Sequence, residues 1–161
     1  MSGIATKAAN SVFYKARMAA KERNEMLSSR EGASEIIGID RTRLARIELG
    51  TLVPYPEEVV LMADVYNAPE LLNFFCAHEC PIGKRIAQQA DFEELNRMTI
   101  NILNAVHDVS SVSQTILPVV ADGQVTDEEM PEMERILAML KPVVKAAAEL
   151  QIWIDKRKGA Q

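Results

Sequence analysis

The sequence has few of the residues that mark disulfide-rich, membrane-spanning or β-rich proteins. Two cysteines among 161 residues cannot build a disulfide scaffold. Aromatic residues make up 5% of the chain, and no run of 18 apolar residues occurs. Alternating β-branched runs are missing, whereas helix-favouring Ala, Leu, Met, Glu, Lys and Arg dominate. The start MSGIATKAAN also has no charged segment leading into an apolar one. We therefore expect an all-α protein that is cytoplasmic and has no membrane contact.

The sequence also has little that favours catalysis. It contains no phosphate-cradling glycine loop, no nucleophile elbow, and only two histidines that could serve as a base. The acidic pairs stand at expected helix starts, where they compensate the helix dipole. We expect no enzyme and no cofactor. The weak candidates for a metal or redox site are Cys76, His78 and Cys80, because two thiols four residues apart share a helix face while His78 points away.

Charge is distributed unevenly along the chain. The formal net charge is −5, but residues 1–85 hold 11 basic and 11 acidic residues, so the remainder carries the whole negative excess. An acidic total therefore does not exclude a polyanionic partner for the N-terminal part, because binding depends on local charge.

The N-terminal part reads as five short helices with clear boundaries. The first three predicted helices cover residues 12–26, 30–37 and 40–49. Ser29 caps the second and Gly38 stops it, and Asp40 caps the third. A fourth helix is predicted to start at Pro56 and a fifth to cover residues 71–77. We expect one compact domain over residues 12–80.

Residues 85–158 have a different pattern, in which apolar residues recur at alternating spacings of three and four. This spacing is the seam of a coiled coil and predicts a long helix from residue 95 to about 119. Thr126 and Glu129 resemble a capping box, and Pro131 and Pro142 predict a late start or a kink in a second long helix. We expect a C-terminal helical hairpin.

The second long helix carries two apolar seams. The first contains Ile136, Met139, Val143, Ala146, Leu150 and Trp153, and the second contains Met133, Leu137, Leu140, Val144, Ala147 and Ile154. One hairpin partner covers only one seam. We therefore expect a homodimer through the C-terminal helices in an antiparallel four-helix arrangement; the alternative is that a single chain buries both seams.

Residues 40–49 sort into two faces when placed on a helix. Leu44, Ile47 and Glu48 point one way, and the arginines lie on the other side. In the first helix, Arg23 stands in line with apolar residues. Because an isolated buried charge is costly, we predict a structural salt bridge between Arg23 and Glu48, unless both side chains reach solvent separately.

Taken together, these residues resemble the Xre/Cro-type, phage repressor-like helix-turn-helix. The resemblance covers about residues 13–72 and rests on Arg23, Ser29, Ala33-Ser34, Gly38-Ile39-Asp40, Leu44, Ile47, Glu48, Gly50, Pro54 and residues 61–65. Two positions depart from the family pattern: Arg30 stands where Gln is frequent, and Ser34, which replaces the usual Ala, is expected to loosen the contact between the second and third helices.

The resemblance implies a five-helix lambda-repressor-like domain that binds double-stranded DNA with its third helix in the major groove. Arg41, Thr42 and Arg46 are then the expected base contacts, and Ser29, Arg30, Arg43 and Thr51 the expected backbone contacts. A dimer would place two such helices about 34–36 Å apart on a palindromic operator, as a transcriptional repressor does. The alternatives are a protein-interaction module and a thiol- or metal-responsive regulator acting through Cys76 and Cys80.

Overall fold

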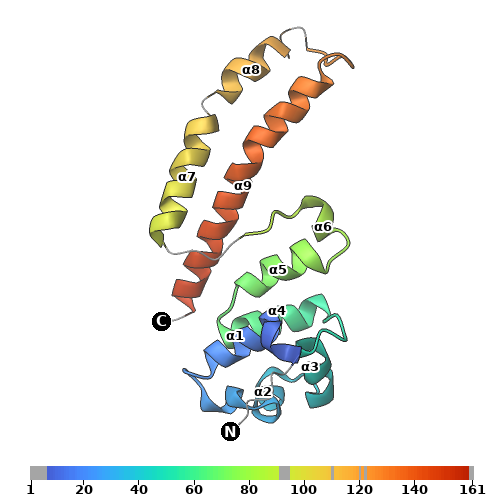
Figure 1. Ribbon diagram of the computed structural model, residues 1–161, viewed down its shortest axis with the longest axis vertical. Coiled ribbons are helices and arrows are strands. Elements are labelled where there is room, and N and C mark those ends of the chain that lie inside the picture. Colours follow the sequence, from blue (N-terminus) through green and yellow to red (C-terminus); the bar gives the residue numbers. More distant parts are fainter. Residues whose placement is uncertain (1–6, 91–94, 110, 120, 122, 160–161) are drawn as a thin grey trace. The chain divides into compact units, whose positions relative to one another are not determined.

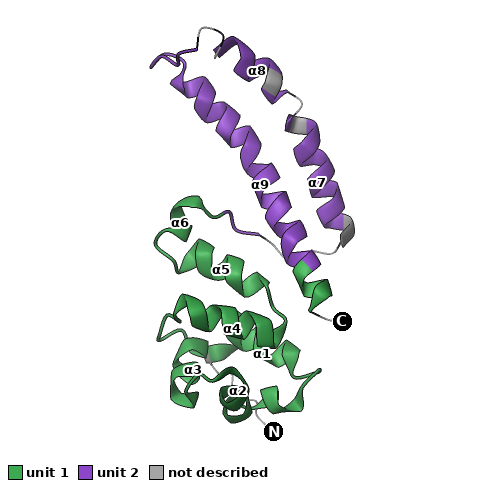
Figure 2. Ribbon diagram, turned by 180° about the vertical axis from the view of Figure 1, so that it is seen from behind, with its two compact units in different colours: residues 1–87, 155–161 green, residues 88–154 purple. Residues whose placement is uncertain are grey.

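The computed structural model describes residues 7–90, 95–109, 111–119, 121 and 123–159, and every regular element among them is helical. The chain forms two compact units, coloured separately in Figure 2: unit 1 comprises residues 1–87 and 155–161, and unit 2 comprises residues 88–154. The expectation of an all-helical protein is confirmed. Over the described ranges, no helix is both long enough and apolar enough to cross a bilayer.

Unit 1 consists of short helices packed around one apolar core (Figure 1). In chain order they are η1 (Lys7–Asn10), α1 (Val12–Ala20), η2 (Glu25–Ser28), α2 (Arg30–Ile37), α3 (Arg41–Glu48), α4 (Pro56–Tyr66), α5 (Glu70–His78) and α6 (Gly83–Ile86). The core contains Phe13, Ala20, Leu27, Ala33, Ile37, Ile39, Leu44, Ile47, Val59, Met62, Ala63, Tyr66, Ala68, Leu71 and Phe75. Helices this short are marginal in water by themselves, so burial of these side chains holds them in place.

Capping side chains begin the central helices of unit 1 where the sequence predicts. The Ser29 hydroxyl accepts a hydrogen bond from the Gly32 N–H at 3.0 Å, and the Asp40 carboxylate accepts one from the Arg43 N–H at 2.9 Å. Gly38 ends α2 in the left-handed region at φ 78°, and Pro56 is the first residue of α4. The boundaries predicted from these residues are confirmed.

The first helix is shorter than predicted. It ends at Ala20 instead of continuing to residue 26, and η2 follows after a turn at residues 21–23. Asn24 explains the interruption, because its side chain accepts from the Met26 N–H at 3.1 Å and so competes with helix continuation. Met26 lies in η2, and its carbonyl oxygen is 2.2 Å from where a Cβ at Gly32 would lie, so only glycine fits at position 32.

Residues 155–159 complete unit 1. The Lys156 ammonium binds the Glu70 carboxylate at 2.7 Å, and the Asn67 side-chain amide donates to the Lys156 carbonyl at 3.0 Å. Asn67 itself is left-handed, with φ 48°, and ends α4. A Cβ at Gly159 would lie 2.2 Å from the Asn67 side-chain oxygen, so a larger residue there would require the Asn67 side chain to move.

Unit 2 contains α7 (Leu95–Val109), α8 (Val112–Val119) and most of α9 (Met130–Lys158). The long helix predicted over residues 95–119 is therefore two helices. The late start of α9 is confirmed, since Thr126 donates its N–H to Glu129 at 2.9 Å and the helix begins only at Met130. Residues Asn101 and Ala105 of α7 line a cavity together with Ala146 and Glu149 of α9, so these two helices lie side by side (Figure 1).

The two apolar seams of α9 differ in burial. In the first seam, Ile136 and Ala146 are buried at 3% and 6% exposure, although Leu150 is 36% exposed. In the second seam, Leu137 is 57% exposed and Val144 is 54% exposed. Within unit 2, the second seam is therefore only partly covered. Further exposed apolar side chains lie on α7 and α8, namely Ile100, Leu103, Val106 and Leu117.

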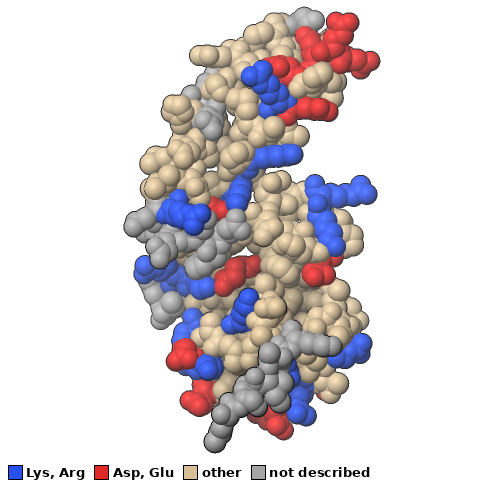
Figure 3. All heavy atoms as spheres, in the orientation of Figure 1, with Lys and Arg blue, Asp and Glu red and all other residues tan. Residues whose placement is uncertain are grey.

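Acidic side chains gather at the beginning of α9, as Figure 3 shows at the end of unit 2 where the connection from α8 enters that helix. They come from Asp127, Glu128, Glu129, Glu132 and Glu134. Carboxylates in this position favour the start of the helix, because its dipole is positive there. The negative excess found in the sequence is thus concentrated in unit 2.

Candidate nucleic-acid interface

The turn between α2 and α3 consists of Gly38, Ile39 and Asp40. Its middle residue, Ile39, is buried at 4% exposure, and the Ser34 hydroxyl donates to the Ile39 carbonyl at 2.6 Å. Ser34 was expected to loosen the contact between the two helices. The structure shows the opposite, because its hydrogen bond ties α2 to the turn.

The inner face of α3 is buried completely. Leu44 is 0% exposed, Ile47 is 2% exposed and Glu48 is 0% exposed. Burying a large aliphatic side chain contributes roughly 1.5–3 kcal/mol, which is enough for two of them to fix an eight-residue helix. The far end of α3 is also closed: the Gly50 N–H binds the Ile47 carbonyl at 3.0 Å and the Thr51 N–H binds the Arg46 carbonyl at 2.9 Å, with Gly50 left-handed at φ 70°.

The buried Glu48 carboxylate is paired with two arginines. Arg17 of α1 donates from Nε to Oε1 at 2.6 Å and from Nη2 to Oε2 at 3.1 Å, and Arg30 of α2 donates from Nε to Oε2 at 2.7 Å. Arg17 is only 3% exposed, and its Nη1 also donates to the Leu27 and Ser28 carbonyls at 2.8 and 3.1 Å. These bonds join α1, η2, α2 and α3 around one charge.

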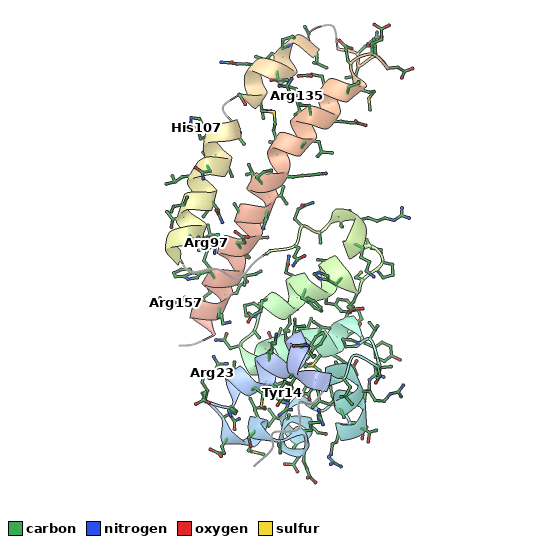
Figure 4. The ribbon with its side chains drawn as sticks, viewed as in Figure 1. Tyr14, Arg23, Arg97, His107, Arg135 and Arg157 are labelled. Atoms are coloured by element: carbon green, nitrogen blue, oxygen red, sulfur yellow. The ribbon has the colours of Figure 1, made fainter. Side chains whose placement is uncertain are left out.

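The predicted salt bridge between Arg23 and Glu48 is wrong. Arg23 lies beyond the end of α1, and its Nη2 donates to the Tyr66 carbonyl of α4. Figure 4 shows Arg23 on the side of unit 1 away from α3. Because α1 stops at Ala20, the helical spacing that aligned Arg23 with the core does not continue that far, and Arg17 takes its place.

The outer face of α3 presents Arg41, Thr42 and Arg46, all of which are exposed. Within the described ranges, neither arginine side chain has a hydrogen bond or an ion pair. Two exposed positive charges therefore lie on one rigid helix with all their donors available. The structure keeps the three predicted base-contact residues together.

Arg43 behaves differently from its neighbours on α3. Its Nε and Nη2 donate to the two carboxylate oxygens of Glu58 on α4, the second bond at 2.8 Å, and its guanidinium lies 4.3 Å from the ring centre of Tyr55. The hydrogen bond from Arg43 lowers the pKa of Glu58 below its usual value, against the opposing effect of partial burial. Arg43 is thus already neutralised by a partner within unit 1.

The remaining predicted backbone contacts differ in the donors they still have. Ser29 and Arg30 adjoin each other at the start of α2, and Arg30 uses only its Nε on Glu48. Thr51 is different, because its hydroxyl donates to the Arg46 carbonyl at 3.1 Å and its N–H donates to the same atom. Thr51 therefore offers no donor to a phosphate in this geometry.

Cys76, His78 and Cys80 do not converge. Cys76 is exposed, whereas Cys80 packs against the core and its sulfur accepts from the Gly83 N–H at 3.4 Å. The His78 ring stacks on Phe74 at 4.5 Å, with its Nδ1 3.1 Å from the Phe74 carbonyl oxygen. In the part of the chain that the structure covers, no three metal-ligating side chains lie together.

Sequence reasoning missed three residues of this region: Arg17, Tyr55 and Glu58. A signal for Arg17 was present, because it stands four residues after Phe13 and three before Ala20, on the same helix face. Glu58 belongs to the acidic pair at the start of α4, which the sequence relates only to the helix dipole. Its partner, Arg43, lies 15 residues earlier on another helix, and no local spacing connects them.

Comparison with protein-family models, curated proteins and solved structures finds no match to this chain. The geometry of α2, α3 and their surroundings therefore carries the functional argument alone.

Proposed function

We propose that unit 1 is a helix-turn-helix module that binds double-stranded DNA in a sequence-specific way, with α3 in the major groove. The observation that carries this proposal is the division of α3 into two faces. Its inner face is fixed by burial and by the Glu48 network, and its outer face presents Arg41, Thr42 and Arg46 without neutralising partners.

The chemistry of these side chains suits the edges of base pairs. An arginine fork matches the two acceptors of guanine, and each such pair contributes about 1–3 kcal/mol of discrimination against another base. Such contacts need a rigid platform, because a mobile helix would lose entropy on binding. The caps at both ends of α3 and its buried face supply that rigidity.

Backbone contacts at the start of α2 would hold α3 in register. Arg30 keeps four N–H groups beyond the one it gives to Glu48, and Ser29 keeps its hydroxyl hydrogen while its oxygen caps the helix. Both groups suit phosphate oxygens. Arg43 and Thr51 are weaker candidates, since the charge of Arg43 is neutralised by Glu58 and the N–H and hydroxyl of Thr51 both bind the Arg46 carbonyl.

The exposed seam of unit 2 supports a homodimer. On each helix, the exposed apolar residues are rotated about the helix axis away from the buried ones. The direction of this rotation is the same for Leu103 and Val106 of α7 as for Leu137 and Val144 of α9. In an antiparallel hairpin this places them on one common face. A second copy of the same face would cover it and form four helices, and the dimer would present two α3 helices to a palindromic operator as a transcriptional regulator.

DNA binding is tested by selecting bound fragments from a random duplex pool. We expect one enriched sequence, and we expect Arg46→Ala and Arg41→Ala each to weaken binding to it by about tenfold or more, the equivalent of 1–3 kcal/mol. The matched control is Lys15→Ala, which removes one exposed positive charge from α1. The proposal fails if no duplex is retained at low salt, or if the control weakens binding as much as the α3 variants do.

Dimerisation is tested by sedimentation equilibrium over a range of protein concentrations. We expect Leu137→Gln with Val144→Gln to shift the protein toward monomer, since both side chains are exposed in a single chain and their loss leaves its core intact. Ala138→Gln adds the same polar group at an exposed position beside the seam and serves as control. A wild-type protein that stays monomeric at every concentration would contradict the dimer.

A further inference from the structure

Arg43 is the one arginine of α3 whose side chain is held by a carboxylate in the described structure. The two guanidinium nitrogens on one edge, Nε and Nη2, meet the two oxygens of Glu58. Arg41 and Arg46, on the same eight-residue helix, have no such partner. The three arginines therefore differ in the charge and in the donors that they present to a polyanion.

The Glu58 carboxylate is fixed by the start of α4. Its Oε2 accepts from the Tyr55 N–H at 2.7 Å, which is the reciprocal bond of a helix-capping arrangement. Its side chain is 13% exposed, against 27% for Arg43. A carboxylate anchored in this way does not need to be ordered when Arg43 binds to it, so the pair forms with little loss of side-chain entropy.

Tyr55 closes a second side of the guanidinium. Tyr55 is 62% exposed, and its ring centre lies 4.3 Å from the guanidinium carbon of Arg43, in cation–π geometry. One of the two edges through which a guanidinium can bind a phosphate with two hydrogen bonds, the Nε/Nη2 edge, is thus filled by Glu58, and one face of the guanidinium plane is covered by Tyr55. Binding a phosphate through that edge requires the Glu58 pair to break first.

We propose that Glu58 is a specificity-determining residue of the DNA interface, because it neutralises the charge of Arg43, occupies one of its two-bond edges and so weakens its attraction to the phosphate backbone. Phosphate contacts strengthen binding to all sequences alike, whereas base contacts discriminate between them. Keeping Arg43 neutral therefore raises the share of binding that depends on Arg41, Thr42 and Arg46. This inference rests on the proposed DNA binding.

The test compares Glu58→Gln with Glu57→Gln. Glutamine at position 58 can still accept from the Tyr55 N–H, so the start of α4 is kept while the negative charge is lost. Glu57 stands next to it in the first turn of α4, is exposed, and makes no ion pair within the described ranges. Each variant removes one negative charge from the first turn of α4, and only Glu58→Gln releases Arg43.

Binding is measured on the selected duplex and on an unrelated duplex at several salt concentrations. We expect Glu58→Gln to tighten binding to the unrelated duplex and to steepen its logarithmic salt dependence by about 0.9, the value for one added phosphate contact. Between about 50 and 200 mM salt, its affinity should then fall about three- to fourfold further than that of the wild type. The ratio of specific to non-specific affinity should decrease. Glu57→Gln should leave the slope unchanged.

Arg43→Ala separates this role from a structural one. We expect it to change the salt dependence little in the wild type, where Arg43 is already paired, but to restore the wild-type slope when combined with Glu58→Gln. The inference is overturned if Glu58→Gln weakens binding, or if Arg43→Ala costs as much in the wild type as in the Glu58→Gln background. Those results would mean that Glu58 presents Arg43 to the phosphate. If no duplex binds to the wild type, the proposed function itself has failed.

Discussion

Replacement of Arg17 by methionine should destabilise unit 1 more than replacement of any other arginine in the Glu48 network. Methionine retains an unbranched apolar stem but removes the guanidinium, and with it four hydrogen bonds, two to Glu48 and two to the Leu27 and Ser28 carbonyls. Glu48, at 0% exposure, would keep only Arg30 as partner. A buried carboxylate that has lost its main partner is costly, because burial removes the water that would otherwise solvate it.

The contacts of each arginine set the expected loss of unfolding free energy when it is replaced by methionine. Breaking a buried ion pair from one side costs about 3–5 kcal/mol, and the remaining bond to Arg30 places Arg17→Met near the lower end, at about 3 kcal/mol. Arg30 is 31% exposed, so Arg30→Met should cost about 1 kcal/mol or less. Arg23→Met removes one hydrogen bond to the Tyr66 carbonyl and should cost about 0.5–1.5 kcal/mol.

Urea unfolding at neutral pH, followed by circular dichroism, measures these differences as shifts in midpoint at unchanged slope. In heating experiments, 3 kcal/mol corresponds to a decrease in Tm of about 12–24 °C for a unit of this size. The single tryptophan, Trp153, stands on α9 two residues before the part of that helix that belongs to unit 1, so its fluorescence provides a second, local probe of unfolding. Adding Glu48→Leu to Arg17→Met should recover most of the loss, since it removes the unpaired charge. Equal costs for Arg17→Met and Arg23→Met would refute the network.

Three further predictions concern single side chains. Arg43 lowers the pKa of Glu58, so the stability that Glu58 contributes is complete above its ordinary pKa of 4.5 and is lost as the pH falls through the lowered value. The difference in unfolding free energy between wild type and Glu58→Gln should be constant above about pH 5.5 and vanish in stronger acid; a difference that grows on acidification would contradict this. Tyr66→Phe should leave Tm unchanged or raise it, because the buried hydroxyl has no hydrogen-bond partner among the described residues; a fall of several degrees would show that a partner exists. Gly32→Ala should lower the unfolding free energy by about 1–3 kcal/mol, although alanine favours helices, because its Cβ would lie 2.2 Å from the Met26 oxygen; an unchanged urea midpoint would show that the backbone can move away.

Helix boundaries could be predicted from the sequence where a single side chain decides them. Ser29, Gly38, Asp40 and Pro56 each act on the backbone within a few residues, by capping, by a left-handed conformation or by a fixed φ. The break between α7 and α8 carries no comparable signal, because the apolar spacing continues across it. Local chemistry is therefore readable from the chain, but an interruption within a regular apolar pattern is not.

Partners distant in sequence could not be predicted in the same way. Helical spacing placed both Arg17 and Arg23 in line with the core. Which of them pairs with Glu48 depends on where α1 ends, and the hydrogen bond of the Asn24 side chain to the Met26 N–H favours the early end. The pairing of Arg43 with Glu58 depends on how α3 and α4 pack, which no periodicity reveals. The exposed set on α3 was predicted from its helical faces, and its role in binding DNA remains a prediction.

If α3 binds DNA as proposed, its two faces separate folding from recognition. Leu44, Ile47 and Glu48 carry its packing, whereas the side chains at positions 41, 42 and 46 make no contact on which the core depends. A population of genes encoding this fold can therefore accumulate changes at those three positions without losing folded protein. New binding preferences can then arise by single substitutions, each in a protein that remains stable. The buried charge network, where most substitutions are costly, keeps the scaffold constant while its outer surface diversifies.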